Sequence, residues 1–321
     1  DYEYSASPAR IDGGWSAEFK IPFSSIAYDK HSTTPWSLLV LRNMTRDQRY
    51  RMYSGAVTRA TNCNLCFSNT IEGMKHLPSG MSWNVTPQLV ARRAQDQIDG
   101  KARVVSSSKD VSLDFKLRPT SAITIDATLN PDFSQIELDS PQLSGNTRFG
   151  IFVQEKRPFF LEGADIFRTP LNAISTRTIA NPDVGLRYTQ RDADKDFSVL
   201  SSRDTAGALV LVPQTYFTGY ATSQVASTAT DARANFRLGS LSLGAVLTDR
   251  QYAQGVGYNR VAGPDFVWQI DRNQLMRAQV LMSTTNAQMN AQGNLARANT
   301  TNGHAAYFDW SRGNDAWGMS V

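Results

Sequence analysis

Alternation of apolar and polar side chains constrains the fold of this chain more than any other feature of its sequence. It is clearest in the C-terminal third, where residues 232–238 alternate strictly and a second alternating run, 241–247, follows Gly239-Ser240. Further alternating runs cover residues 265–271, 276–283 and 306–310. A period of two over so many residues predicts strands with one apolar and one polar face. The sequence therefore predicts an all-β protein.

The spacing of these runs predicts connections of alternating length. Short turns are expected at Gly239-Ser240, Arg272-Asn273 and near Gly313-Asn314, and long loops at about 250–264 and 284–303. Outer-membrane β-barrels combine brief periplasmic turns with longer external loops. A soluble β-sandwich is the open alternative, because its strands alternate in the same way. A propeller is disfavoured, since no internal repeat of fixed period is evident.

Composition is compatible with a barrel and excludes two other classes. Mean hydropathy is −0.37, and no stretch reaches the roughly 18 consecutive apolar residues of a membrane helix. Barrel strands keep average hydropathy low because only every second residue faces lipid. The net charge of +4 is scattered along the chain, so nucleic acid is not an expected partner. If the barrel interpretation holds, polar residues of the alternating runs face its lumen: Arg233, Arg237, Asp271 and Arg277.

The first 80 residues have a different character. Alternation over 15–21 predicts a half-buried strand that ends at Pro22, and a second strand is expected over 36–42. Cys63 and Cys66 form a lone CxxC motif in an Asn-rich context, for which we expect a local disulfide or two idle thiols. A zinc site would need two more ligands, and the histidines are far apart in sequence.

A dense run of charged residues and phenylalanines occupies the middle of the chain. Buried charges are costly unless they are paired, so this run predicts a charged network inside the barrel or at its rim. Its expected members are Arg148, Glu155, Lys156, Arg157 and Glu162. Two alternatives stay open. Glu155 with Glu162, or Asp132 with Glu137, could serve as a glycosidase carboxylate pair, and Asp132, Glu137 and Asp139 could bind calcium, although their spacing does not match an EF-hand.

The same run carries a resemblance to a known family. The segments LNPDFSQIELD, NTRFG and EKRPFFLEGADIF, between residues 129 and 167, resemble the signature of the bacterial domain of unknown function 5916. Upstream, GGWSAEFKIPFSSIAYD and WSLLVLRN resemble the carbohydrate-binding family 9-like domain that normally precedes it. One departure is Phe152-Val153-Gln154, where the family more often has an aromatic-Pro step; this leaves the turn geometry there open.

The resemblance implies a domain organisation. Residues 1–80 would be the C-terminal part of a periplasmic, carbohydrate-binding family 9-like β-sandwich, and residues 81–321 an incomplete antiparallel outer-membrane β-barrel. Members of the family are longer, so we expect the chain to be a fragment. Trp15 and Trp36 are the candidates for stacking on a sugar, although Trp15 shares a face with Phe19 and Ile21, which favours a core position.

We therefore expect a non-enzymatic outer-membrane barrel protein, a channel or an assembly component, that needs no catalytic residue, metal or other cofactor. Its expected partners are outer-membrane lipid, a glycan and other outer-membrane subunits. Two alternatives stay open: a soluble β-protein that binds or hydrolyses polysaccharide, and a structural subunit of a larger outer-membrane complex.

Overall fold

The structure is a computed structural model. It describes residues 4–23, 26, 28, 35–45, 47–57, 63–74, 77, 81–98, 101–131, 155, 157–179, 181–205, 209–213, 218–222, 225–290, 294–313 and 318–320. Nearly all regular structure in these residues is β-strand, so the predicted all-β class is confirmed. No helix among them is long and apolar enough to cross a membrane.

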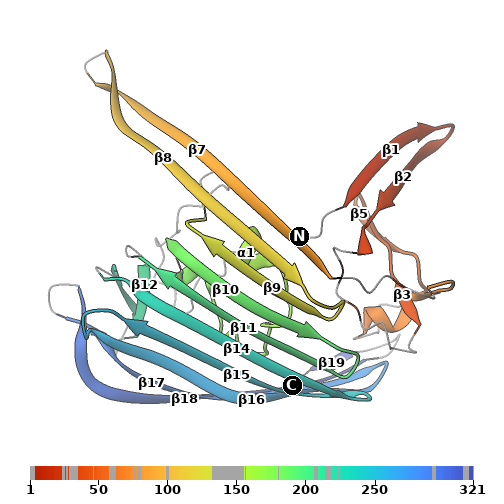
Figure 1. Ribbon diagram of the computed structural model, residues 1–321. Helices are drawn as coiled ribbons and strands as arrows, with labels where there is room; N and C mark the ends of the chain where they lie inside the picture. The colour runs from red at the N-terminus through yellow and green to blue at the C-terminus, as the bar shows by residue number, and fades with distance from the viewer. Residues whose placement is uncertain are drawn as a thin grey trace.

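An antiparallel sheet of 11 strands dominates the molecule (Figure 1). Neighbouring strands are mostly consecutive in sequence, and the sheet curves strongly between β7 and β18. In spatial order the strands are β7 (Ser82–Ile98), β8 (Lys101–Arg118), β9 (Ile123–Leu129), β10 (Pro182–Arg191), β11 (Lys195–Asp204), β14 (Ser227–Leu238), β15 (Leu241–Tyr252), β16 (Gly257–Asp271), β17 (Gln274–Met289), β18 (Leu295–Gly313) and β19 (Gly318–Ser320).

Tight turns join the strands at one end of the sheet, which we call the short-turn end. Residues 119–122, 192–194, 239–240 and 272–273 make these turns. Gly239 has φ +63, a left-handed conformation that glycine adopts without strain. At Arg272-Asn273 the Asp271 carboxylate accepts a hydrogen bond from the backbone N of Asn273 at 2.8 Å. Both turns lie where the sequence predicts them.

The opposite end, the long-loop end, carries the two longest connections. Residues 130–181 join β9 to β10, and residues 205–226 join β11 to β14 and contain the hairpin of β12 (Leu209–Pro213) and β13 (Thr218–Thr222). The two long loops predicted at 250–264 and 284–303 are wrong. Strands β15 and β16 continue through the first, and β17 and β18 pair through much of the second, as in Thr285 with Thr301.

The sheet has its apolar side chains exposed and its polar side chains buried. On the apolar face, Leu186 and Phe236 are about half exposed and Leu89 is 75% exposed. On the polar face, Asp126, Arg187 and Asp265 are nearly inaccessible to solvent. This is the reverse of a soluble sheet, which buries its apolar face against a core.

Residues before Ser82 form three two-stranded sheets, which are what the structure describes of the expected sandwich: β1 (Ser5–Ile11) with β2 (Gly14–Lys20), β3 (Trp36–Leu38) with β6 (Asn69–Ile71), and β4 (Leu41–Thr45) with β5 (Arg49–Tyr53). The strand predicted over 36–42 is instead broken between β3 and β4. The face of β2 predicted to be half-buried is largely exposed, with Trp15 at 53% and Phe19 at 65%.

Candidate functional site: the charged polar face and its cover segment

A short irregular segment lies against the polar face. We call residues 155 and 157–179 the cover segment; it contains the helix α1 (Pro158–Leu161) and a 3-10 turn at Thr176–Thr178. Pro158 suits the first helical position, because proline has its φ fixed near the helical value and lacks only an N–H that would have no helical partner there. Gly163, just beyond the helix, has φ +68 and turns the chain back.

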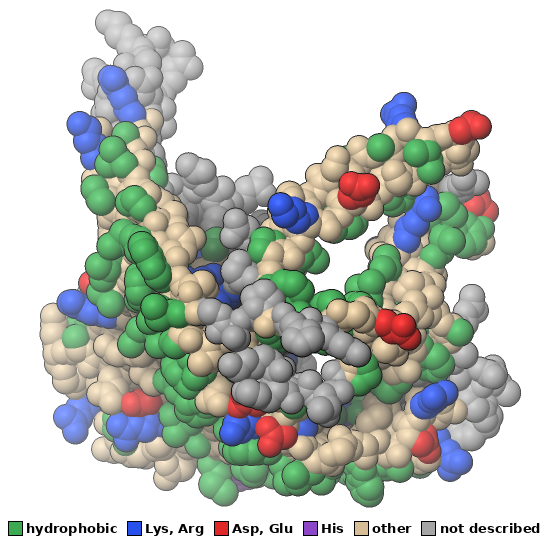
Figure 2. Space-filling model, turned by 45° about the vertical axis from the view of Figure 1, so that its right-hand side comes forward, with side chains coloured by type: hydrophobic (Ala, Val, Ile, Leu, Met, Phe, Trp, Pro, Cys, Tyr) green, Lys and Arg blue, Asp and Glu red, His purple; other side chains and the backbone are tan. Residues whose placement is uncertain are grey.

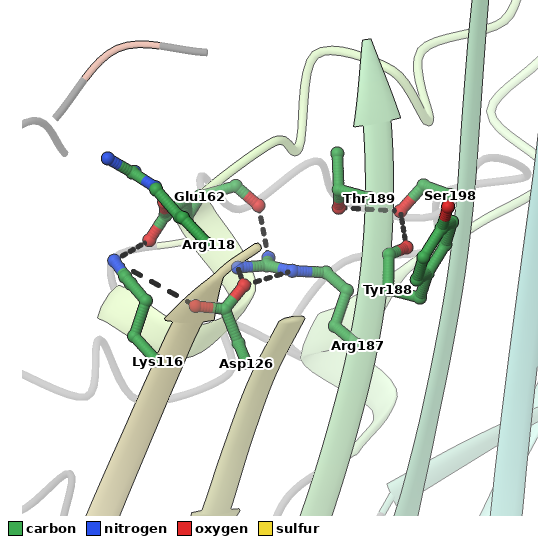
Figure 3. A network of polar contacts seen from close by, with 8 residues as sticks. All are labelled: Lys116, Arg118, Asp126, Glu162, Arg187, Tyr188, Thr189 and Ser198. Atoms are coloured by element: carbon green, nitrogen blue, oxygen red, sulfur yellow. Dashed lines mark hydrogen bonds and ion pairs between the residues drawn. The ribbon is translucent and has the colours of Figure 1, made fainter. Parts of the chain in front are cut away.

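Charged side chains from β8, β9 and β10 meet Glu162 of the cover segment (Figure 3). Arg187 donates from Nη2 to Asp126 Oδ2 at 2.9 Å, and Lys116 Nζ lies 3.8 Å from Asp126 Oδ1. The Glu162 carboxylate accepts hydrogen bonds from Lys116 and, at 3.0 Å, from Arg118 Nη2. Arg187 also donates to the carbonyl oxygen of Glu162. These contacts hold the C-terminal end of α1 against the three adjacent strands β8, β9 and β10.

Burial and charge act in opposite directions on Glu162. Burial alone would raise the pKa of its carboxyl group, but the charges of Lys116, Arg187 and Arg118 outweigh burial and lower the pKa. Glu162 therefore stays ionised at neutral pH. Charge-assisted hydrogen bonds of this kind are roughly twice as strong as neutral ones.

Aromatic rings pack beside this charged network. A side chain at Gly185 would come within 2.7 Å of the Phe159 ring, so the absence of a side chain there makes room for Phe159 against β10. The Arg187 guanidinium lies 5.5 Å from the same ring. Next to it is a buried apolar cluster of Phe160, Phe167, Ile179, Leu200 and Ala229. Phe160, Phe167 and Ile179 of the cover segment thus pack with Leu200 of β11 and Ala229 of β14 on the polar face.

Arg157 and Glu155 tie the two ends of the cover segment together. Arg157 donates to the Glu155 carboxylate from Nε at 2.9 Å and from Nη2 at 2.8 Å, and to the carbonyl oxygen of Thr176 at 2.8 Å. The Thr176 hydroxyl donates to Glu155 at 2.7 Å. Burial would raise the pKa of Glu155, but the hydrogen bonds and charge of Arg157 lower it to about 2. The segment is therefore closed on itself as well as bound to the sheet.

Three further contacts join the cover segment to strands β10, β17 and β15. Asp165 forms two hydrogen bonds with Arg191 of β10, one of them 2.8 Å long. The backbone N of Leu171 donates to Gln279 Oε1 of β17 at 2.6 Å. Arg250 of β15 donates to the carbonyl oxygen of Thr178 at 2.9 Å.

Ion pairs continue along the polar face beyond the cover segment. Arg233 of β14 reaches over β15 to Asp265 of β16, with Nη2 and Oδ1 2.8 Å apart. Arg250 is 2.8 Å from Asp204 of β11, and Arg277 is 2.9 Å from Asp309 of β18. Arg237 pairs with Asp196. Positive and negative side chains thus alternate over the polar face from β8 to β18.

Most residues of the predicted network and lumen lie on or against this face. Glu155, Arg157 and Glu162 belong to the cover segment, and Arg233, Arg237 and Arg277 to the polar face. Asp271 differs from the prediction: it is exposed at the end of β16, where its carboxylate accepts hydrogen bonds from Asn273 and Gln274 at the β16–β17 turn. Arg148 and Lys156, and the calcium candidates Asp132, Glu137 and Asp139, lie outside the described residues.

The remaining candidates lie in the N-terminal region. The Trp15 side chain is about half exposed, and the Arg42 guanidinium lies 4.7 Å from the centre of its ring. Trp36 packs against Phe23 and Tyr28, with ring centres 6.2 and 5.6 Å away. Cys63 and Cys66 form a disulfide. Sugar binding by Trp15 and Trp36 stays a prediction, and within the described residues no group of His, Cys, Asp and Glu is placed to hold a metal ion.

Several functional side chains were not singled out from the sequence. Asp126, Arg187, Asp204 and Asp265 are charged members of alternating strands, and each is an ion-pair partner on the polar face. Their occurrence at the polar positions of alternating runs is the sequence signal that could have identified them. Their partners depend on strand register, which the sequence does not display.

A protein-family model matches part of the chain that includes this site. Residues 89–200 match the model described as domain of unknown function (DUF5916). This region belongs to the DUF5916 family. The match covers β8–β10 and the cover segment, so the DUF5916 region includes the network around Glu162. No curated protein matches the chain significantly.

Weak likenesses to solved structures were also found. The chain is similar to OmpT with loop L8 deleted, an outer membrane protein of Vibrio cholerae, at 8% identity and a TM-score of 0.31, over 75% of this chain and 95% of that chain. In-vitro folded OmpT of Vibrio cholerae gives 10% identity and a TM-score of 0.30, over 78% and 87% of the two chains.

Proposed function

We propose that the 11-stranded sheet forms part of the wall of an outer-membrane β-barrel whose polar face lines the lumen and is plugged by the cover segment. The observation that carries this proposal is the reversal of the two faces of the sheet. An apolar face exposed over the strands of a large sheet would be a severe aggregation hazard in water. In a bilayer the same face is solvated by lipid.

Aromatic side chains support a membrane boundary at the short-turn end. Trp83 of β7, Trp268 of β16 and Trp310 of β18 lie on the apolar face close to this end. Phe197 and Phe236 lie there too, on β11 and β14. Tryptophan and other aromatic rings gather where hydrocarbon meets the headgroups.

Contacts of the N-terminal region support a periplasmic position for it. The backbone N of Tyr28 donates to the carbonyl oxygen of Ser121, in the β8–β9 turn, at 2.9 Å. Arg272, in the β16–β17 turn, lies 5.6 Å from the Phe67 ring. Both turns belong to the short-turn end, which faces the periplasm in bacterial barrels.

We propose a non-enzymatic role in which the plugged lumen controls what passes through the barrel. The carboxylates of Glu155 and Glu162 are each engaged by basic side chains, which suits a structural network better than a proton-transfer pair. A plug held by ion pairs to β8 and β10 and by hydrogen bonds to β15 and β17 would restrict what passes through the barrel. Glycan binding and association with other outer-membrane subunits stay predictions.

Two neighbouring alanines give a matched test of membrane embedding. Ala305 and Ala306 of β18 are both exposed, and alternation points Ala305 to the polar face and Ala306 to the apolar face. In a bilayer we expect Ala306→Arg to lower the free energy of unfolding by about 2–4 kcal/mol, the cost of arginine facing lipid near the midplane. Ala305→Arg should cost far less, because its side chain enters a polar space.

The measurement is urea unfolding of the full chain folded into lipid vesicles, with heat-modifiability on gels to confirm folding. Equal effects of the two substitutions, or a chain that stays in the aqueous phase without detergent, would rule out the membrane proposal.

A further inference from the structure

The hairpin of β7 and β8 extends beyond the rest of the sheet at the long-loop end (Figure 1). Strand β8 pairs with β9 only over Leu113–Leu117, whereas its pairing with β7 continues to Lys101. Figure 2 shows basic side chains on this arm above a stretch of hydrophobic ones. The part of the hairpin near Val111 is therefore where the apolar face gives way to polar side chains.

Three polar residues follow the apolar row on the same face of this hairpin. Leu89 and Val111 are paired, and are 75% and 66% exposed. The next positions on that face pair Ala91 with Lys109, and Arg93 with Ser107. Arg93, Ser107 and Lys109 are all exposed. Side chains on diagonal positions of adjacent strands lie within reach of one another when they are long, so both cations and the hydroxyl can approach one anion.

These two cations differ from the other basic residues at this level of the apolar face. Arg203 of β11 lies 3.5 Å from Asp183, and Arg260 of β16 lies 2.9 Å from Asp249. Within the described part of the chain, Arg93 and Lys109 form no such pair, and Asp110 points to the polar face. Among the described side chains, Arg93 and Lys109 thus lie without an ion-pair partner next to the exposed Leu89 and Val111.

We infer that Arg93, Ser107 and Lys109 bind the phosphate of a phosphorylated glycolipid in the outer leaflet. This inference rests on the proposed function, which puts the long-loop end at the cell exterior. Arginine supplies a planar fork of donors, lysine a compact charge and serine a further donor, all suited to phosphate oxygens. The glycolipid's acyl chains would lie along Leu89 and Val111. Attraction of basic residues to anionic headgroups falls off within a Debye length. Arg93 and Lys109 follow directly after the exposed pair Leu89 and Val111, which places both cations close to where the headgroups would lie.

The test uses the full chain in mild detergent with purified bisphosphorylated lipid A as the probe, and bound lipid measured by native mass spectrometry. We expect Arg93→Ala with Lys109→Ala to weaken binding by about thirtyfold, roughly five- to sixfold for each cation. Arg93→Lys with Lys109→Arg should keep most of the binding. Lys195→Ala is the matched control, because Lys195 is an exposed lysine of the apolar face at the short-turn end.

Three outcomes would overturn the inference: unchanged binding in the double alanine variant, an equal loss in Lys195→Ala, or equally tight binding of dephosphorylated lipid A or phosphatidylglycerol. Insertion into vesicles and heat-modifiability are measured on the same preparations. A chain that does not insert defeats the proposed function, whereas an inserted chain whose double variant binds normally defeats only the glycolipid site.

Discussion

Gly244 is a position of the polar face where the packing leaves no room for a side chain. A side chain there would come within 2.4 Å of the Arg233 guanidinium, which lies over β15 on its way to Asp265. Both charged side chains are almost fully buried. Glycine at this position therefore permits a buried ion pair to span three strands.

We predict that Gly244→Ala lowers the free energy of unfolding in lipid vesicles by about 1–3 kcal/mol, the usual cost of overpacking. Arg233→Ala should cost about 3–5 kcal/mol, because it leaves the Asp265 charge buried without its partner. Gly303→Ala is the control, since its nearest contact is only the Ser283 hydroxyl, which can rotate away. A Gly244→Ala protein as stable as the Gly303→Ala protein would contradict this account.

The cover segment is the element whose stability should depend most directly on pH. The pKa of Glu155 falls from its ordinary value of 4.5 to about 2 in the folded chain. A lowered pKa means that Glu155 contributes stability above about pH 4.5, and that this contribution is lost as pH falls from there through 2. The contact with Arg157 should thus persist in mild acid and fail only near pH 2.

Pepsin can measure this, because it works in acid and the cover segment contains Phe159, Phe160 and Leu161. We expect wild-type chain to resist cleavage there at pH 3.5 and to be cut near pH 2. Glu155→Gln should be cut at pH 3.5 about tenfold faster or more, consistent with roughly 1.5 kcal/mol for a charge-assisted hydrogen bond. Glu18→Gln, in exposed strand β2, should behave as wild type; the same pH profile in both variants would refute the role of Glu155.

The strands could be predicted from sequence more completely than their connections or the site. Alternation located the β14–β15 and β16–β17 turns because a side-chain period of two follows from strand geometry. The alternation pattern did not predict strands over 284–303. Asn, Thr and Gln occur there at both odd and even positions, so the sequence of these paired strands resembles that of a loop. Ion pairs such as Arg233 with Asp265 join residues on strands that are not adjacent, and only the register reveals them.

At the scale of the whole molecule, the contact between Arg272 and Phe67 links the N-terminal region to the wall. Phe67 ends the short 3-10 helix (Asn64–Phe67) that contains Cys66, and Arg272 lines a depression of about 380 Å³ between the β16–β17 turn and Arg312. A cation over an aromatic ring at an exposed site contributes about 0.5–1 kcal/mol. The hydrogen bond from Tyr28 to Ser121 supplies a second, independent link.

We therefore predict that Arg272→Ala and Phe67→Ala each speed amide hydrogen exchange over residues 63–71, while heat-modifiability of the barrel stays unchanged. The double variant should exchange little faster than either single one, because each substitution removes the same contact; the coupling free energy should be about 0.5–1 kcal/mol. Arg312→Ala is the control, since Arg312 lines the same depression without facing the Phe67 ring in any described contact. Strictly additive effects would mean that Arg272 and Phe67 act separately, and that the N-terminal region is held to the wall by other contacts.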